Sequence, residues 1–234
     1  MKILVASDIH GSSYYCSLLL EKVKKEAPDR LLLLGDILYH GPRNDLPEGY
    51  APKKVIDMLN QMKDSIFCVR GNCDTEVDQM VLEFPILADY AIIPEGDRFI
   101  YATHGHVYNS QKLPPIRKTD ILLHGHTHVP VCIKNPDHIY INPGSVSIPK
   151  EDSPHSYMTF DGERFLWKNI DTGEVYKEAE KVAAEREQVK TNKLWLDIIP
   201  KNIYVDDIVA KYNISGRYVL CSWIMKYNAN MELK

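Results

Sequence analysis

Buried strands alternate with amphipathic helices in the hydrophobic pattern of the first third of the chain. Three short apolar runs predict buried strands, namely residues 2–7, 30–34 and 65–69. Two longer segments predict helices, 13–26 with Ser12 as the N-cap and 52–62. This alternation is typical of α/β proteins, in which ligands bind beyond the carboxyl ends of the strands.

From residue 87 onward the pattern changes to shorter, alternating segments that are separated by turns. Strands are expected at 87–94, 98–103, 120–124, 129–134, 138–142, 156–160 and 164–170. Together these segments predict a second, more antiparallel sheet. The tight loop at residues 142–145 is expected to bring backbone amides close to an anion.

Beyond residue 172 the chain changes character again. Residues 174–192 are charged and helix-prone, and the apolar positions between 205 and 226 fit two helices joined by a short turn. We therefore divide the chain into a domain of residues 1–175 and a mostly helical extension of residues 176–234. The spacing in the extension resembles a helix-turn-helix, but its second helix carries few positive charges, so packing against the core or a sister subunit is favoured over DNA binding.

Composition narrows the classes of partner. The 234 residues, 44% of them apolar, suffice for one large core, and the net charge of −4 predicts neither a nucleic-acid-binding nor a membrane-binding surface. No apolar run is long enough to span a bilayer, and the first residues enter a strand without room for a signal peptide. The five cysteines lack paired spacing, which favours a reduced, cytoplasmic protein.

Candidate metal ligands lie at the carboxyl ends of the predicted strands. Asp8 and His10 follow the first strand two positions apart, so both side chains can reach one point. The full candidate set is Asp8, His10, Asp36, Asn72, His104, His126 and His128. These ligands are too many for one ordinary ion and fit two ions that share a carboxylate. Nitrogen and oxygen donors without a thiolate favour Mn, Fe, Zn, Co or Ni, and the resulting positive site would bind a phosphate ester.

The order of the motifs resembles the calcineurin-like metallophosphoesterases, and among them the small bacterial YfcE-like phosphodiesterases. The motifs are Asp8-x-His10, Gly35-Asp36, Gly71-Asn72, His104-Gly105-His106 and Gly125-His126-Thr127-His128. The resemblance covers about residues 1–175 and implies a four-layer αββα sandwich with a dinuclear site. By position it implies that Asp8, His10 and His128 hold the first metal and that Asn72, His104 and His126 hold the second. Asp36, the lone carboxylate of the middle strand, would bridge them.

The resemblance also implies a phosphodiesterase that hydrolyses small phosphodiesters by attack of a metal-bridging hydroxide, with two divalent ions, Mn²⁺ first among them. The wider superfamily often has His after the Asn, where this chain has Cys73. A thiol with a pKa of about 8.5 is a poor general acid for an alkoxide, so diesters with good leaving groups are expected rather than monoesters. Cys73 is also a candidate oxidation site.

Several neighbouring residues have open roles. Asp74 would either cap the following helix or steer Cys73. His40 and Arg43, in the loop at 39–50, are candidates for substrate binding, with plain exposure as the alternative for each. His106 and His124 are expected to point the other way along their strands, into positions behind the ligands or in the core, and His138 and His155 are expected at the surface.

A non-catalytic scaffold similar to the retromer vacuolar-sorting subunit is the alternative function, because that protein shares the implied fold but has lost part of its metal ligation. The complete ligand set in this chain favours the enzyme. We expect a cytoplasmic homo-oligomer that acts on a small phosphate ester, with no membrane or nucleic-acid partner. A third hypothesis is an enzyme that binds DNA through its extension, and only the helix-turn-helix spacing of that extension supports it.

Overall fold

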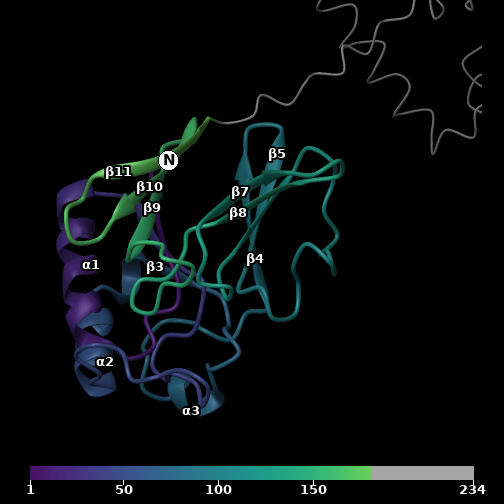
Figure 1. Ribbon diagram of the computed structural model, residues 1–234. Coiled ribbons are helices and arrows are strands. Elements are labelled where there is room, and N and C mark those ends of the chain that lie inside the picture. Colours follow the sequence, from purple (N-terminus) through teal and green to yellow (C-terminus); the bar gives the residue numbers. More distant parts are fainter. Residues whose placement is uncertain (181–234) are drawn as a thin grey trace, which may run out of the picture. The chain divides into compact units, whose positions relative to one another are not determined.

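The computed structural model describes residues 1–180, which belong to the first of the two units into which the chain divides, Met1–Val182. The helices predicted between 205 and 226, and almost all of the predicted extension, lie outside the described residues. Figure 1 shows two sheets with helices beside one of them. No helix in the described part is long and apolar enough to cross a membrane.

The helices and strands of residues 1–180 follow one another in a mostly α/β order at first and in an all-β order later. They are β1 (Ile3–Ala6), α1 (Ser13–Glu26), β2 (Arg30–Leu33), α2 (Pro52–Asn60), the 3-10 turn η1 (Lys63–Ser65), β3 (Ile66–Cys68), α3 (Glu76–Gln79), β4 (Tyr90–Glu95), β5 (Arg98–Thr103), β6 (Ile121–His124), β7 (Val131–Lys134), β8 (Ile139–Asn142), β9 (Ser156–Phe160), β10 (Arg164–Asn169) and β11 (Val175–Glu180). The strands and helices predicted for residues 1–170 are therefore confirmed, with small shifts at their ends. Ser12 caps α1 as predicted, because its hydroxyl accepts a hydrogen bond from the Tyr15 amide at 3.2 Å.

The strands form a six-stranded sheet, β11-β10-β9-β1-β2-β3, and a five-stranded sheet, β4-β5-β6-β8-β7. The expectation that the segments from residue 87 onward form one second, more antiparallel sheet is wrong in two respects. First, β9 pairs antiparallel with β1 and brings β10 and β11 into the six-stranded sheet. Second, β5, β6 and β8 pair in parallel. Alternation of polar and apolar residues locates a strand but does not specify its partner.

The last described strand occupies part of a segment for which a helix is expected. Residues 174–192 are charged, but β11 pairs along β10 as the outermost strand of the six-stranded sheet. A charged sequence suits such an edge strand because it discourages pairing with another chain. The helix prediction is wrong for the residues of β11, and its remainder lies outside the described part.

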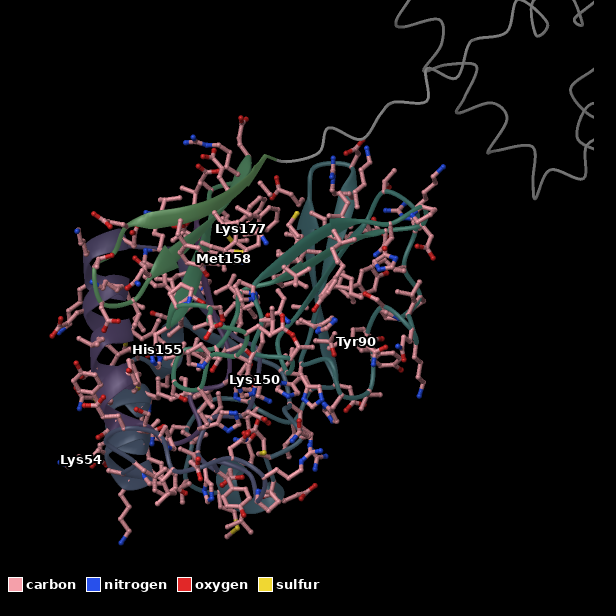
Figure 2. The ribbon with its side chains drawn as sticks, viewed as in Figure 1. Lys54, Tyr90, Lys150, His155, Met158 and Lys177 are labelled. Atoms are coloured by element: carbon pink, nitrogen blue, oxygen red, sulfur yellow. The ribbon has the colours of Figure 1, made fainter. Side chains whose placement is uncertain are left out.

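Two apolar clusters separate the layers. Helices α1 and α2 pack on one face of the six-stranded sheet, where Leu4 and Leu31 meet Leu19 and Leu59. The other face of this sheet packs against the five-stranded sheet, and Met158 of β9, labelled in Figure 2, belongs to that cluster. The predicted mixed α/β fold with two sheets and few helices is confirmed. Within residues 1–180, both longer helices lie on the six-stranded sheet.

Candidate metal centre

The seven predicted ligands gather at the edge where parallel strands of both sheets end. Loops after β1, β2 and β3 in the six-stranded sheet carry Asp8, His10, Asp36 and Asn72. Loops after β5 and β6 in the five-stranded sheet carry His104, His126 and His128. The site therefore lies across the interface between the two sheets.

The first group contains Asp8, His10 and His128, whose potential ligand atoms lie within 4.8 Å of one another. Asp8 Oδ1 is 3.3 Å from His128 Nε2 and 3.7 Å from His10 Nε2. The two Nε2 atoms are 3.4 Å apart. All three side chains are almost fully buried. This arrangement matches the ligand set expected for the first metal.

The second group contains Asn72, His104 and His126. His104 Nε2 lies 3.0 Å from Asn72 Oδ1 and 3.1 Å from His126 Nδ1. Asp36 lies between the two groups, since its Oδ2 is 3.8 Å from His10 Nε2 and 3.5 Å from His104 Nε2. A single carboxylate is thus within reach of both groups.

The hydrogen bonds of the imidazoles leave lone pairs facing one another. The Nδ1 atoms of His10, His104 and His128 lie 2.8, 2.6 and 2.5 Å from the carbonyl oxygens of Tyr39, Leu34 and Ile148. A carbonyl only accepts, so each Nδ1 carries the proton and each Nε2 carries a lone pair. Lone pairs on neighbouring Nε2 atoms repel unless a cation lies between them, and hydrogen bonds of this kind orient imidazole ligands in metal sites.

The charges of the site agree with this assignment. Asp8 Oδ1 is buried and makes no hydrogen bond with any described residue. Burial alone would raise the pKa of Asp8, but the imidazoles of His128, His104 and His10 outweigh it and hold that pKa well below its usual range. Burial lowers the pKa of His126 and keeps this imidazole neutral. Burial alone would lower the pKa of His128, but the hydrogen bond and the charge of Asp8 outweigh it and raise that pKa. An ionised carboxylate beside converging imidazole nitrogens suits a divalent cation, so the residues present fit the group.

The comparisons with known proteins agree with this geometry. Residues 1–164 match the family model of the calcineurin-like phosphoesterase superfamily domain. The chain belongs to the calcineurin-like phosphoesterase superfamily. Members of such a family require divalent metal ions, so the predicted family and the predicted class of cofactor are confirmed.

Among known members of the superfamily, phosphodiesterase YfcE of Escherichia coli K12 is 46% identical over 163 residues, which cover 70% of this chain and 89% of YfcE. The solved structure of YfcE from E. coli, described as a phosphoesterase, superposes with a TM-score of 0.74 at 42% identity and covers 76% of this chain and 98% of that one. Vacuolar protein sorting 29 from Cryptosporidium parvum superposes with a TM-score of 0.52 at 19% identity, covering 76% and 96% of the two chains. The last likeness shows the fold alone.

Close packing of the loops accounts for two glycines of the superfamily motifs, Gly71 and Gly125. Five non-glycine residues of the site have positive φ angles, namely Asp8 (60°), His10 (49°), Asp36 (54°), His126 (67°) and His128 (63°). The loops that hold them are also packed closely. A Cβ on Gly71 would lie 2.2 Å from the Asp36 amide nitrogen, and one on Gly125 would lie 1.9 Å from Ser7 Oγ. Glycine is therefore required beside these ligands because no side chain fits.

Asp74 links the tips of two strands. Its carboxylate accepts hydrogen bonds from the amides of Asp36, Ile37 and Gly71 at 2.8, 2.9 and 2.7 Å. Burial raises its pKa to about 6 although these amides favour the charged form. Thr75, not Asp74, is the N-cap of α3, so the capping role expected for Asp74 is wrong. Asp74 instead fixes the loop that carries Asp36.

Cys73 lies directly beside the ligands. Its amide donates to Asp36 Oδ1 at 2.8 Å, and the Asn72 side-chain amide donates to its Sγ at 3.2 Å. Its Sγ, together with one atom each from His10 and Asp36, forms another group within 4.8 Å. Burial and the carboxylate of Asp36 raise the pKa of the Cys73 thiol, which favours the protonated form.

The two residues proposed to bind substrate differ in environment. His40 is half-buried, with ring centroids of Tyr39 and Tyr50 at 4.7 and 5.3 Å. Arg43 is exposed in the same loop. His106 is also exposed, which excludes the core, and its ring lies 5.4 Å from that of His104, so of the two expected positions it has the one beside the candidate ligands.

The other three histidines are packed. His124 is buried and stacks on Tyr140, as expected for a residue that faces away from the metals. His138 is buried, and its Nδ1 lies 2.7 Å from an oxygen of Asp137, so its surface assignment is wrong. His155, labelled in Figure 2, stacks on Tyr15 with centroids 3.9 Å apart and is half-buried, so it is partly at the surface. Isolated histidines gave no signal of these local partners.

The loop at residues 142–145 supports Asp8, and the amide of Gly144 is not available to an anion. The hydroxyl groups of Ser145 and Ser147 donate to the carbonyl oxygen of Asp8 at 3.1 and 3.0 Å. The amide of Gly144 is already bonded to Asn142 Oδ1 at 2.9 Å. These serines were not among the predicted site residues, because their effect on Asp8 depends on how two distant loops meet.

Proposed function

We propose that this protein is a phosphodiesterase that hydrolyses small phosphodiesters with two divalent metal ions. The observation that carries the proposal is the convergence of seven side chains whose imidazole lone pairs face one another around buried carboxylates. The relative in E. coli K12, which is 46% identical, is named a phosphodiesterase. A structure with the same fold but without this ligand set would not carry the proposal.

We infer two sets of ligands, the same two that the family resemblance implies. Asp8, His10 and His128 would hold one ion, Asn72, His104 and His126 would hold the other, and Asp36 would contact both. Bound ions would supply Lewis acidity and a water of lowered pKa. Two carboxylates against two divalent cations leave a positive site, which attracts the phosphoryl group and favours the additional negative charge of its transition state.

Two side chains of this protein are proposed to act on the ester directly, Asn72 and Cys73. The Asn72 side-chain amide contacts the thiol of Cys73, so both lie on the same side of the ligand cluster. Cys73 would donate its proton to the leaving oxygen of the ester. A thiol is a weak general acid, and a good leaving group such as a phenoxide needs less protonation than an alkoxide does, which favours activated diesters over monoesters.

The identity of the metal and the cellular setting belong to the same proposal. Nitrogen and oxygen donors accept several first-row metals, among which we propose Mn²⁺. The four cysteines of the described part are all free, which supports a reducing, cytoplasmic location. Self-association through the apolar residues after 205 stays a prediction.

Replacement of Cys73 tests the proposed proton donor. Hydrolysis of bis(p-nitrophenyl) phosphate and of p-nitrophenyl phosphate would be compared with Mn²⁺ present, because both release the same leaving group. Cys73→His is expected to raise the monoester rate relative to the diester rate. Cys132→Ser, which alters a half-buried cysteine on β7, is the control. An unchanged ratio in Cys73→His would contradict the assignment.

Metal analysis tests the dinuclear site itself. The wild-type chain is expected to bind two ions, and Asp36→Asn is expected to weaken both because it removes the shared carboxylate charge. The scaffold alternative finds support only in the fold. It would be favoured if the protein bound no metal and turned over neither ester under Mn²⁺.

A further inference from the structure

We propose that Tyr39, His40 and Tyr50 form a subsite that stacks against an aromatic substituent of the phosphate ester, an aryl group or a nucleobase. This inference rests on the proposed function, because the subsite selects substrates for the same metal centre. It names a class of substrate that the ligand set alone does not distinguish.

The loop segment at residues 39–41 runs from a metal ligand to the proposed proton donor. The carbonyl oxygen of Tyr39 accepts the Nδ1 hydrogen of His10 at 2.8 Å. Two residues later, a Cβ on Gly41 would lie 3.4 Å from Cys73 Sγ. The side chains of Tyr39 and His40 therefore leave the backbone between the first ligand group and the thiol. An ester held at the metals would have this segment at its side.

The three rings form one cluster with edge contacts. The Tyr39 and His40 centroids are 4.7 Å apart with an interplanar angle of 68°, and those of His40 and Tyr50 are 5.3 Å apart at 81°. The Tyr39 side chain is 43% exposed, which leaves ring surface for a ligand. His40 Nδ1 is buried and has no hydrogen-bond partner among the described residues. An occupant with both a planar ring and a polar group would satisfy both features.

The cluster is held in place before any ligand arrives. The Asn44 side-chain amide donates to the His40 carbonyl at 2.8 Å. At the other end of the loop, Tyr50 packs so closely against Gly11 that a Cβ there would lie 2.6 Å from its ring. The amide of Ala51 donates to the Gly11 carbonyl at 2.8 Å. Fixed aromatic rings lose little entropy on binding, so a planar group is recognised at low cost.

Binding of two phosphonates, which are not hydrolysed, tests the subsite independently of catalysis. Phenylphosphonate and cyclohexylphosphonate carry the same head group and rings of similar size, but only the former is aromatic. Calorimetry with the Mn²⁺-loaded full chain is expected to show that phenylphosphonate binds about 2- to 12-fold more tightly, the usual range for an aromatic pair. Tyr39→Leu should reduce this ratio to about one, and Tyr39→Phe should retain it.

Two controls distinguish a loss of ring stacking in the subsite from a general effect of removing a tyrosine and from a loss of hydrolysis. Tyr176→Ala removes another tyrosine, 38% exposed on β11, and should leave the ratio unchanged. A wild-type ratio near one, or a ratio that survives Tyr39→Leu, would overturn the subsite. Hydrolysis of bis(p-nitrophenyl) phosphate is measured separately, so its absence would refute the proposed function while the phosphonate ratio still decides the subsite.

Discussion

Gly125→Ala should disable the metal centre by sterics alone. The added Cβ would lie 1.9 Å from Ser7 Oγ, 2.8 Å from Ser7 Cβ and 2.9 Å from Asp8 Oδ2. Carbon and oxygen atoms in ordinary contact are separated by about 3.5 Å, so the loops after β1 and β6 must part by about 1.5 Å. Overpacking of this kind costs about 1–3 kcal/mol in the free energy of unfolding.

The displaced atoms belong to a ligand and its immediate support. Asp8 Oδ2 accepts a hydrogen bond from the His126 amide at 3.2 Å, and this bond connects the two groups of candidate ligands. The substitution should therefore displace Asp8 relative to His126. Loss of such support typically weakens metal binding about 10- to 100-fold. Calorimetry with Mn²⁺ measures this loss, and thermal unfolding in EDTA measures the stability of the fold without the metal.

Two further variants make the test specific. In Gly162→Ala the nearest atom would be 3.8 Å away, but the φ of +97° strains any side chain, so stability should fall without weaker Mn²⁺ binding. Adding Ser7→Gly to Gly125→Ala removes two of the three close contacts and should restore part of the affinity. A folded Gly125→Ala protein that binds Mn²⁺ as tightly as the wild type would refute the steric reasoning.

Three other predictions concern metal removal, the support of Asp8, and pH. Dialysis against EDTA should lower the melting temperature, since a ligand at a thousand times its Kd stabilises by about 4 kcal/mol; a melting temperature independent of Mn²⁺ would argue against a site in the folded protein. Ser145→Ala and Ser147→Ala each remove a hydrogen bond to the Asp8 carbonyl and should each cost about 1 kcal/mol in urea unfolding, with weaker Mn²⁺ binding. If affinity is unchanged in the double variant, these serines support only the fold. Burial alone would raise the pKa of Glu26, but hydrogen bonds from two lysines outweigh it and lower that pKa. The ionised Glu26 carboxylate should therefore stabilise the fold above about pH 4.5, and this stabilisation should be lost as the pH falls further. The free energy of unfolding of Glu26→Gln should accordingly be lower than that of the wild type by about 1–3 kcal/mol at pH 7 and by less at pH 3.

The strands and the meeting of the seven candidate ligands can be predicted from the sequence because both depend on local pattern. Each of β1, β2 and β3 is a short apolar run, and a ligand follows each run within a few residues. In parallel strands the carboxyl ends meet at one edge, so Asp8 and Asp36 had to be neighbours once the strands were recognised. The glycines beside the ligands mark the same places, since the loops there are too close for a Cβ.

Sheet membership and local partners could not be predicted in this way. The pairing of β9 with β1 joins segments that are more than 150 residues apart, and no periodicity specifies such a partner. Asp74 was ambiguous because its three amide donors come from two separate loops. His138 was misplaced because its burial depends on how the turn between β7 and β8 packs.

The candidate ligands are contributed by both sheets, with Asp8, His10, Asp36 and Asn72 on one side and His104, His126 and His128 on the other. Bound ions would therefore fasten the two sheets to each other, much as a disulfide fastens two loops. Any opening that separates the sheets would have to break metal–ligand bonds first. Amide hydrogen exchange in β1 and in β6 should accordingly slow together when metal is added, although these strands belong to different sheets.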